Sequence, residues 1–169
     1  ICAGASQIAL MAEEKLHSQF LFAPSRQSKA LLRSGMEINM EFFDVRTPDG
    51  EPTGQVKERS AVHRDGDWHG TAHIWLVGRK NGRLQVLLQK RSRNKETFPG
   101  CFDTSCAGHL SAGDSFEEGA LRELSEELGI RAQASELFYV GLYSYEVKES
   151  FGGKNIIDRG IAAVDLYQK

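Results

Sequence analysis

The sequence predicts an α/β protein built around a mixed β-sheet. Short β-rich runs alternate with strong turn signals over most of the chain, and one helix is well marked at about residues 115–128. Strand signals lie upstream of that helix and again near 138–146 and 161–167. Because a helix between strands usually packs on the sheet that those strands form, these observations favour one layered α/β domain.

Length and composition suit one soluble globular domain. The chain has 169 residues, 40% of them hydrophobic and 26% charged, and its formal net charge is −2. Because the chain has no excess of basic residues, we do not expect duplex nucleic acid as a partner. No apolar run reaches the roughly 20 residues that span a bilayer, so no membrane partner is expected. Cys2, Cys101 and Cys106 are few and odd in number, which predicts free thiols and a cytoplasmic location.

Residues 1–35 differ from the rest of the chain. One amphipathic helix is predicted over 8–22, followed by loop-like sequence at 23–26. Met36 would serve as a natural start. We therefore expect an N-terminal extension over 1–35, either native or an expression remnant, and a main domain over 36–169.

Upstream of the strong helix, the sequence predicts a series of strands and turns. A short strand at 41–45 runs into the turn at 47–50. The β-rich runs at 73–77 and 84–89 flank Asn81-Gly82, the pair preferred in a type I′ hairpin turn. A further turn signal follows at 98–100, where Phe98-Pro99-Gly100 interrupts the regular structure.

The helix at about 115–128 has clear start and stop signals. Ser115 followed three residues later by Glu118 has the pattern of a capping box, and Gly129 lies just past the last apolar position. The apolar residues Phe116, Ala120, Leu121, Leu124 and Leu128 share one arc of the helix. This arc is expected to pack on the sheet.

Three glutamates lie on a second arc of the same helix. Glu123, Glu126 and Glu127 gather beside the apolar stripe, and Arg122 is the cation nearby. Like charges at this spacing weaken an isolated helix, whereas Mg²⁺ and Mn²⁺ prefer such clustered oxygens. The charges alone leave open a solvated acidic face or a metal site.

Residues 108–130 resemble the signature of the Nudix family, G-x5-E-x7-R-E-U-x-E-E-x-G-U, in which U is a bulky aliphatic residue. Each fixed position matches except Asp114, which stands where the signature has Glu. The resemblance implies a Nudix-type α/β/α sandwich around a mixed β-sheet. It also implies a hydrolase, dependent on Mg²⁺ or Mn²⁺, that cleaves a diphosphate linkage in a nucleoside-diphosphate-X or related small molecule. A homodimer is left open.

Position by position, the resemblance assigns roles to the residues of this segment. Glu126 and Glu127 would be the main metal ligands, and Glu123 a further ligand or the base that deprotonates the attacking water. The backbone carbonyl of Ala107 or Gly108 would complete the metal shell.

Other residues around the signature receive supporting roles. Arg122 would orient a glutamate, and Asp114 would buttress the loop and the helix. Arg91 and Lys95 would bind the diphosphate, although a solvated basic loop is the alternative, and His109 is a further candidate for substrate binding.

Segments 61–69, 73–76 and 98–109 resemble the type I isopentenyl-diphosphate isomerases, which use the same fold for a proton shift. Those enzymes need a cysteine where this chain has Ala107. Cys106, one place earlier, would point to the opposite side of an extended strand.

Two further isomerase features match in part. The isomerases carry a later Glu-x-Glu pair, which falls near 157–160, where only Asp158 is acidic. Two metal-site histidines correspond loosely to His63 and His69, which are read either as ligands or as surface-loop residues.

The leading hypothesis is therefore a Nudix hydrolase of the isomerase-like branch. The alternatives are an isopentenyl-diphosphate isomerase and a non-catalytic module that binds a nucleotide or a partner. Nudix domains usually continue with a further strand and helix. Either the domain is truncated at Lys169, or a partner or the N-terminal extension covers that face of the sheet.

Overall fold

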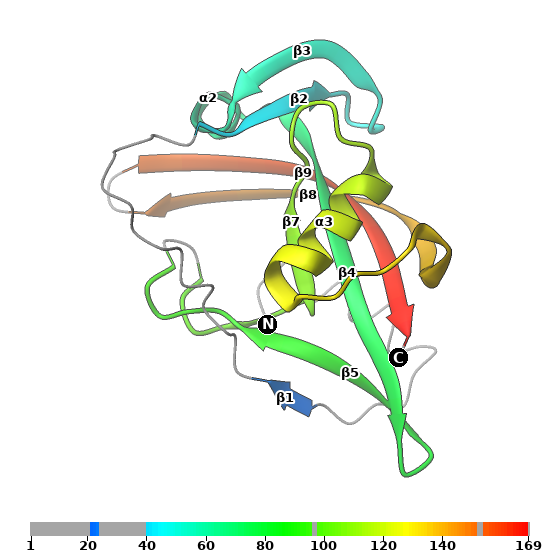
Figure 1. Cartoon of the computed structure of the whole chain (residues 1–169). Helices are drawn as coiled ribbons and strands as arrows, with labels where there is room; N and C mark the ends of the chain where they lie inside the picture. Colours follow the sequence, from blue (N-terminus) through cyan, green and yellow to red (C-terminus); the bar gives the residue numbers. More distant parts are fainter. Residues whose placement is uncertain (1–20, 24–39, 96–97, 152–153, 169) are drawn as a thin grey trace, which may run out of the picture.

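The computed structural model describes residues 21–23, 40–95, 98–151 and 154–168, and shows a mixed β-sheet crossed by one helix (Figure 1). The strands of this part are β1 (Leu21–Ala23), β2 (Phe42–Arg46), β3 (Pro52–Glu58), β4 (Trp68–Lys80), β5 (Arg83–Lys90), β6 (Phe102–Asp103), β7 (Cys106–His109), β8 (Leu137–Phe151) and β9 (Lys154–Gln168). Its helices are α2 (Arg59–Asp65), α3 (Phe116–Leu128) and the 3₁₀ turn η1 (Ala134–Glu136). No helix within the described ranges is long and apolar enough to cross a membrane.

The long strand β4 organises the sheet. Its first residues pair antiparallel with β2, its middle with β7 and its end with β5. On its other side β9 runs parallel to it over ten register pairs, from Trp68↔Arg159 to Val77↔Gln168, and β8 pairs antiparallel with β9. The beginning of β4 therefore lies where β2, β7 and β9 converge.

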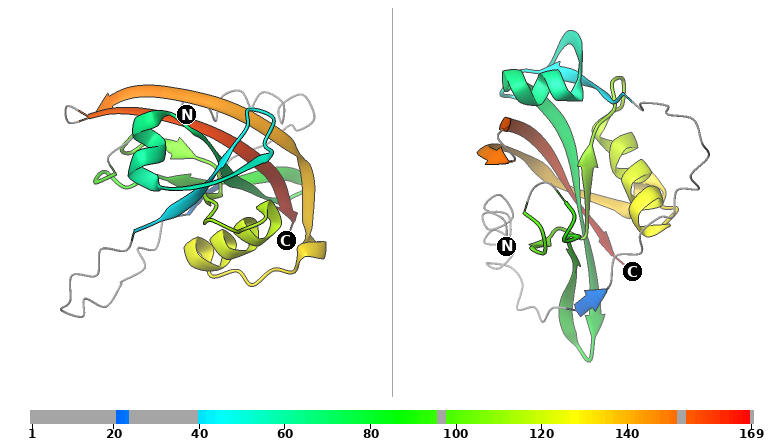
Figure 2. Two further views of the ribbon diagram at one scale, coloured as in Figure 1. Left: turned by 90° about the horizontal axis from the view of Figure 1, so that it is seen from above. Right: turned by 90° about the vertical axis from the view of Figure 1, so that its left-hand side faces the viewer.

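The two faces of the sheet carry separate cores. On one face, α3 packs on the sheet (Figure 2), and the buried residues there are Ala72, Ile74, Cys106, Leu110, Ala120, Leu124 and Tyr167. On the other face, Trp75 packs with Val86 and Val164. The mixed sheet with a helix on its face confirms the predicted fold class, and the apolar arc of the helix packs as expected.

Local signals in the sequence placed the hairpin and the helix correctly. Asn81 and Gly82 both have positive φ, 52° and 75°, as a type I′ turn requires. The strands are longer than predicted, and β8 and β9 reach 15 residues each. The alternation of half-buried and exposed residues in β8 ends near the predicted boundary, because Lys148, Glu149 and Ser150 are all exposed.

Several short or exposed elements were missed, among them β3 and α2, and one prediction was wrong at its edge. The strand β3 is exposed at nearly every position and α2 has only 7 residues, so neither shows a usable hydrophobic period. The helix predicted over 8–22 lies mostly outside the described residues. Its end is instead the strand β1, because the backbone at 21–23 pairs in parallel with β5.

Free backbone groups are satisfied at both ends of α3. The Ser115 hydroxyl accepts the N–H of Glu118 at 3.2 Å, and the Glu118 carboxylate accepts the N–H of Ser115 at 2.9 Å. The backbone N–H and the hydroxyl of Ser115 both donate to the Glu118 carboxylate, and these two bonds hold the pKa of Glu118 below its ordinary value. At the other end Gly129 has φ 67°, the left-handed conformation that closes helices. The capping box therefore fixes where the glutamate-bearing helix begins.

Replacing Ser115 by alanine is expected to lower the free energy of unfolding by about 1 kcal/mol, because the N-terminal amides lose their acceptor. Urea denaturation measures this change. Ser125→Ala, at an exposed position within α3, is the control and should change stability by less than about 0.5 kcal/mol. Equal losses in both variants would show that the cap contributes nothing specific.

Candidate functional site

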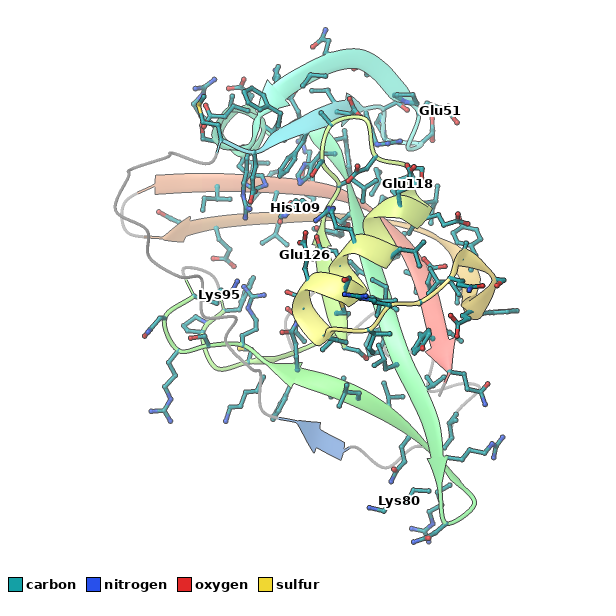
Figure 3. All side chains as sticks on the ribbon, viewed as in Figure 1. Glu51, Lys80, Lys95, His109, Glu118 and Glu126 are labelled. Atoms are coloured by element: carbon teal, nitrogen blue, oxygen red, sulfur yellow. The ribbon has the colours of Figure 1, made fainter. Side chains whose placement is uncertain are left out.

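Two groups of polar side chains meet at the end of β7 (Figure 3). Gly108 lies against Glu123 of α3, and the next residue, His109, lies among histidines from other elements. Residues 106–109 pair with 71–74 of β4, so the central strand holds this junction in place.

The carboxylate of Glu123 lies directly against the backbone of Gly108. A Cβ added at Gly108 would lie 2.1 Å from Glu123 Cδ, which no side chain could tolerate. Glu123 is only 8% exposed. Burial raises its pKa; the attraction of Arg122 opposes this shift, and the charge of Glu127 adds to it. A glutamate of raised pKa is suited to proton transfer near neutral pH.

The variant Gly108→Ala is expected to lose about 1–3 kcal/mol of unfolding free energy, because the new methyl group displaces the Glu123 carboxylate. The companion variants are Glu123→Ala and the double variant. Since Glu123→Ala removes the clashing atoms, the alanine at 108 should cost much less in that background. Additive losses in urea denaturation would contradict the clash.

Arg122 joins the helix to β7. Its Nη1 donates to Glu123 Oε1 at 2.8 Å and to Glu126 Oε2 at 3.2 Å, and its Nη2 donates to the carbonyl of His109 at 2.8 Å. Its Nε lies 3.4 Å from Asp114 Oδ2, which ties the preceding loop to the helix. One guanidinium therefore fixes two glutamates relative to the histidine-bearing strand.

The two faces of β7 carry different chemistry. Cys106 is fully buried on the α3 side. Burial raises the pKa of its thiol, which also donates a hydrogen bond to Glu127. Ala107 and His109 alternate with Cys106 and face the other way. The thiol therefore points away from the side of the sheet that carries the histidines, as the alternation predicted.

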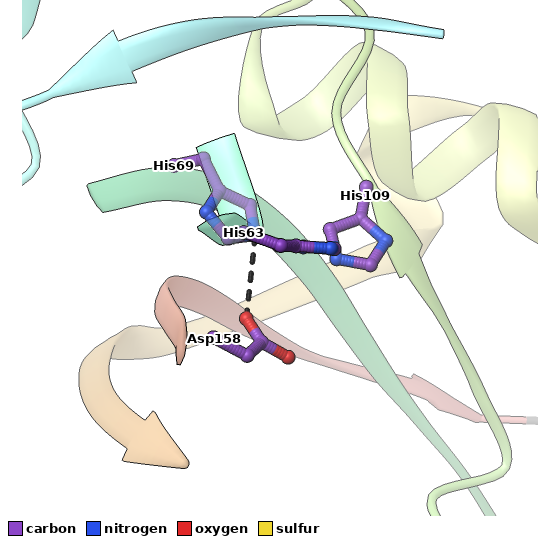
Figure 4. Close-up of side chains that lie close together, drawn as sticks. All are labelled: His63, His69, His109 and Asp158. Carbon is purple, nitrogen blue, oxygen red and sulfur yellow. Dashed lines mark ion pairs between the residues drawn. The ribbon is translucent and has the colours of Figure 1, made fainter. Parts of the chain in front are cut away.

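A histidine cluster lies on that other side (Figure 4). It consists of His63 from α2, His69 from β4, His109 from β7 and Asp158 from β9. One ligand atom from each lies within 4.8 Å of the others, and His69 Nε2 is 3.4 Å from Asp158 Oδ1. Elsewhere in the described ranges, no group of three or more histidine, cysteine or acidic side chains converges in this way.

The donor atoms of the histidine cluster suit a divalent cation. Nε2 of each histidine and Oδ1 of Asp158 are buried without a hydrogen-bond partner in the described structure. Such atoms are costly unless something binds them. Three imidazole nitrogens and one carboxylate oxygen make a set typical of Zn²⁺ and related transition ions.

The protonation pattern also suits metal binding. Nδ1–H of His69 donates to the carbonyl of Asp67 at 3.1 Å, so Nε2 directs its lone pair at the cluster. Burial lowers the pKa of His63 and, by more, that of His109. Burial alone would raise the pKa of Asp158, but its contact with His69 and the nearby His109 lowers it. Neutral imidazoles and an ionised carboxylate are the forms that bind metal.

Phe43 of β2 holds the rings of the histidine cluster. Its ring stacks on His109 at 4.9 Å and on His69 at 5.4 Å, with interplanar angles of 8° and 15°. Phe43 is 2% exposed, so this stacking is part of the core. The imidazoles are therefore oriented by packing before any ligand arrives.

The histidine cluster was only partly foreseen. His69 is fully buried, so its interpretation as a surface-loop residue was wrong: its strand lies between β2 and β9. Asp158 was noted as the acidic residue of its segment but not as a ligand. The register pair His69↔Gly160 puts Asp158 on the same face, two residues away along β9.

The other candidate residues lie around this junction. Arg91 pairs with Asp103 at 2.9 Å, and Lys95 is exposed in the loop after β5. Ala107 pairs with His73 in the ladder between β7 and β4. The roles in binding diphosphate or metal that the sequence suggested for Arg91, Lys95, His109 and Ala107 remain predictions.

Comparisons with known proteins agree with this geometry. A family profile described as the NUDIX domain matches residues 67–165. An uncharacterized Nudix hydrolase of Clostridium acetobutylicum is 42% identical over 128 residues, which are 75% of this chain and 59% of that protein. An isopentenyl-diphosphate Delta-isomerase of Halorhodospira halophila is 32% identical over 115 residues, which are 68% of this chain and 62% of the enzyme.

A solved structure from Deinococcus radiodurans has the same fold, with a TM-score of 0.54 at 20% identity, over 76% of this chain and 72% of that one. The chain thus spans about three-fifths of the two curated relatives, 59% and 62% of their lengths. The profile covers more than half of the chain and includes the whole of the signature around α3. The chain belongs to the Nudix family.

Proposed function

We propose that the chain is a divalent-metal-dependent hydrolase that cleaves a diphosphate linkage in a nucleoside-diphosphate-X or related small molecule, in the cytoplasm. The observation that carries this proposal is the junction at Gly108–His109. There Arg122 ties the glutamates of α3 to the strand that carries the histidine cluster. Acidic and imidazole ligands gathered at one place can bind the cations that a reaction on a highly charged diphosphate requires.

Two sets of residues would hold cations. Glu123, Glu126 and Glu127, with the carbonyl of Ala107, offer oxygen ligands for Mg²⁺ or Mn²⁺. The histidine cluster offers nitrogen-rich ligands for an ion such as Mn²⁺ or Zn²⁺. Bound cations neutralise the diphosphate and lower the pKa of a bound water.

The remaining roles in the reaction would be taken by side chains of this protein. Glu123, whose pKa is raised by burial, would accept the proton of the attacking water. Arg122 would keep that carboxylate in position through its contact of 2.8 Å. Arg91 and Lys95 would pair with diphosphate oxygens.

The rival function is isomerisation of isopentenyl diphosphate. The histidine cluster favours it, because two of its members match the isomerase metal-site histidines. Against it, Cys106 is buried beneath α3, and Ala107, which faces the histidine side, has no proton to transfer. We therefore rank hydrolysis first.

The test is a screen of nucleoside triphosphates, dinucleotides, sugar nucleotides, coenzyme A derivatives and isopentenyl diphosphate with Mg²⁺ or Mn²⁺. Release of phosphate or diphosphate that stops on chelation is the expected result. Isomer formation without release would favour the isomerase. No turnover by folded protein across the panel would favour a binding module.

A further inference from the structure

A separate cavity lies on the helix side of the sheet, on the face opposite the histidine cluster. Its volume is about 290 Å³, near the lower end for small-molecule sites. Its walls include Phe116 of α3, Leu137, Tyr139 and Leu142 of β8, and Ala163 and Asp165 of β9. Asp165 and Asp158 are an odd number of residues apart on the same strand, so they face opposite sides. Figure 1 shows the start of α3, η1 and the beginning of β8 at the same side of the molecule.

Asp165 is the unusual member of this lining. It is 6% exposed, and no described hydrogen bond or ion pair reaches its carboxylate. Burial raises its pKa, and the charge of Glu117 adds to the effect. Glu123, the buried glutamate of α3, is by contrast paired with Arg122. Neither of the oxygens of Asp165 is among the fully buried polar atoms that lack a partner, so Asp165 presents its carboxylate to the open space of the cavity.

The charges around the cavity select one class of ligand. Asp165 and Glu117 both line it, and no lysine or arginine does among the described residues. Arg46, whose guanidinium lies 4.6 Å from the centroid of the Phe116 ring, donates to the carbonyl of Gly50 and is not part of the lining. Phosphates and carboxylates would therefore be repelled, and the diphosphate substrate does not belong here.

We propose that this cavity binds a small organic cation, an alkyl- or arylammonium compound whose charge pairs with Asp165. Its apolar body would lie against Phe116, Leu137 and Leu142, all of which line the cavity. The aromatic ring of Tyr139 would add a favourable contact with the ammonium group. Because Phe116 and Glu117 form the first turn of α3, the ligand would bind at the start of the helix that carries the catalytic glutamates. The inference does not depend on which diphosphate is hydrolysed.

The test is a titration with benzylamine and cyclohexylamine, and with benzyl alcohol and cyclohexanol as neutral counterparts. Binding is followed by NMR shifts of Leu137, Leu142 and Ala163 and by the rise in thermal midpoint. We expect saturable binding in which each amine binds at least about tenfold more tightly than its alcohol, as a charge-assisted hydrogen bond provides.

Two variants separate the charge from the cavity. Asp165→Asn keeps the shape and should weaken amine binding about tenfold or more without affecting alcohol binding. Asp49→Asn, in an exposed turn, is the matched control and should bind as the unchanged protein does. Ala163→Leu should fill the cavity and reduce binding of both compounds. If that variant does not fold, Asp165→Asn still decides the matter.

Three results would overturn the proposal. The first is the absence of saturable amine binding to the folded protein, and the second is equal affinity for amine and alcohol. The third is undiminished amine binding by Asp165→Asn. None of these measurements uses hydrolysis, so they stand apart from the outcome of the substrate screen.

Discussion

Exchanging both Glu126 and Glu127 for glutamine is expected to reduce metal-dependent hydrolysis by about 10³-fold or more. Both side chains are exposed on α3, so they are available to a cation, and glutamine keeps their length while removing the charge. Repulsion among the acids of the helix falls at the same time, so the folded state should not be weakened. The measurements are kcat/KM with Mg²⁺ and with Mn²⁺, and urea denaturation of the same samples.

The matched control is the double variant Glu51→Gln, Glu58→Gln. It makes the same change of net charge at exposed positions of the β2–β3 hairpin and the start of α2. Activity should be retained there. If the α3 variant also retained activity, its two glutamates would not be the essential ligands, and the histidine cluster would become the principal metal site.

The parts of the fold that were predictable depend on interactions between near neighbours in the chain. A capping box needs only residues 115 and 118, and a type I′ turn needs only Asn81 and Gly82. The preferred backbone conformations of the capping box and the turn are set within a few residues, so both can be predicted from the local sequence alone. The apolar arc of α3 follows equally from local periodicity.

The histidine cluster could not be assembled in the same way. Its members come from α2 and β4, which follow one another in the chain, and from β7 and β9, which lie about 40 and 90 residues further on. Only the register of the sheet brings them together, and a shift by one residue along β9 would send Asp158 to the other face. Neither the spacing of His63 and His69 nor the Nudix signature contains that register.

The burial of Asp165 could not be predicted from the sequence for a different reason. The segment 161–167 reads as an apolar strand with one acid in it, which a strand with a solvated face would accommodate. The structure buries both faces at this point, since Val164, Asp165 and Tyr167 are each less than 10% exposed. Burial on two sides depends on α3 and on the neighbouring strands, so the charge became notable only when the packing was known.

Removing one member of the histidine cluster is expected to abolish tight binding of a transition metal without disturbing the glutamate site. In His69→Gln and in Asp158→Asn, affinity for Zn²⁺ or Co²⁺ should fall about 100-fold or more, because a ligand is lost and another buried atom is left unpaired. The measurements are metal content after dialysis and the visible spectrum of the Co²⁺ protein, which reports nitrogen ligands. His73→Gln is the control, since His73 lies on the same strand outside the cluster.

The α3 double variant completes the comparison. Glu126→Gln, Glu127→Gln should retain the Co²⁺ spectrum while losing hydrolysis, and Asp158→Asn should lose the spectrum. Because Phe43 and the neighbouring strands orient the imidazoles, metal removal from the unchanged protein should lower its thermal midpoint without unfolding it. If the Co²⁺ spectrum followed the α3 glutamates and ignored Asp158, the cation would bind at α3 alone. The unpaired nitrogens of the cluster would then need a ligand other than a metal ion.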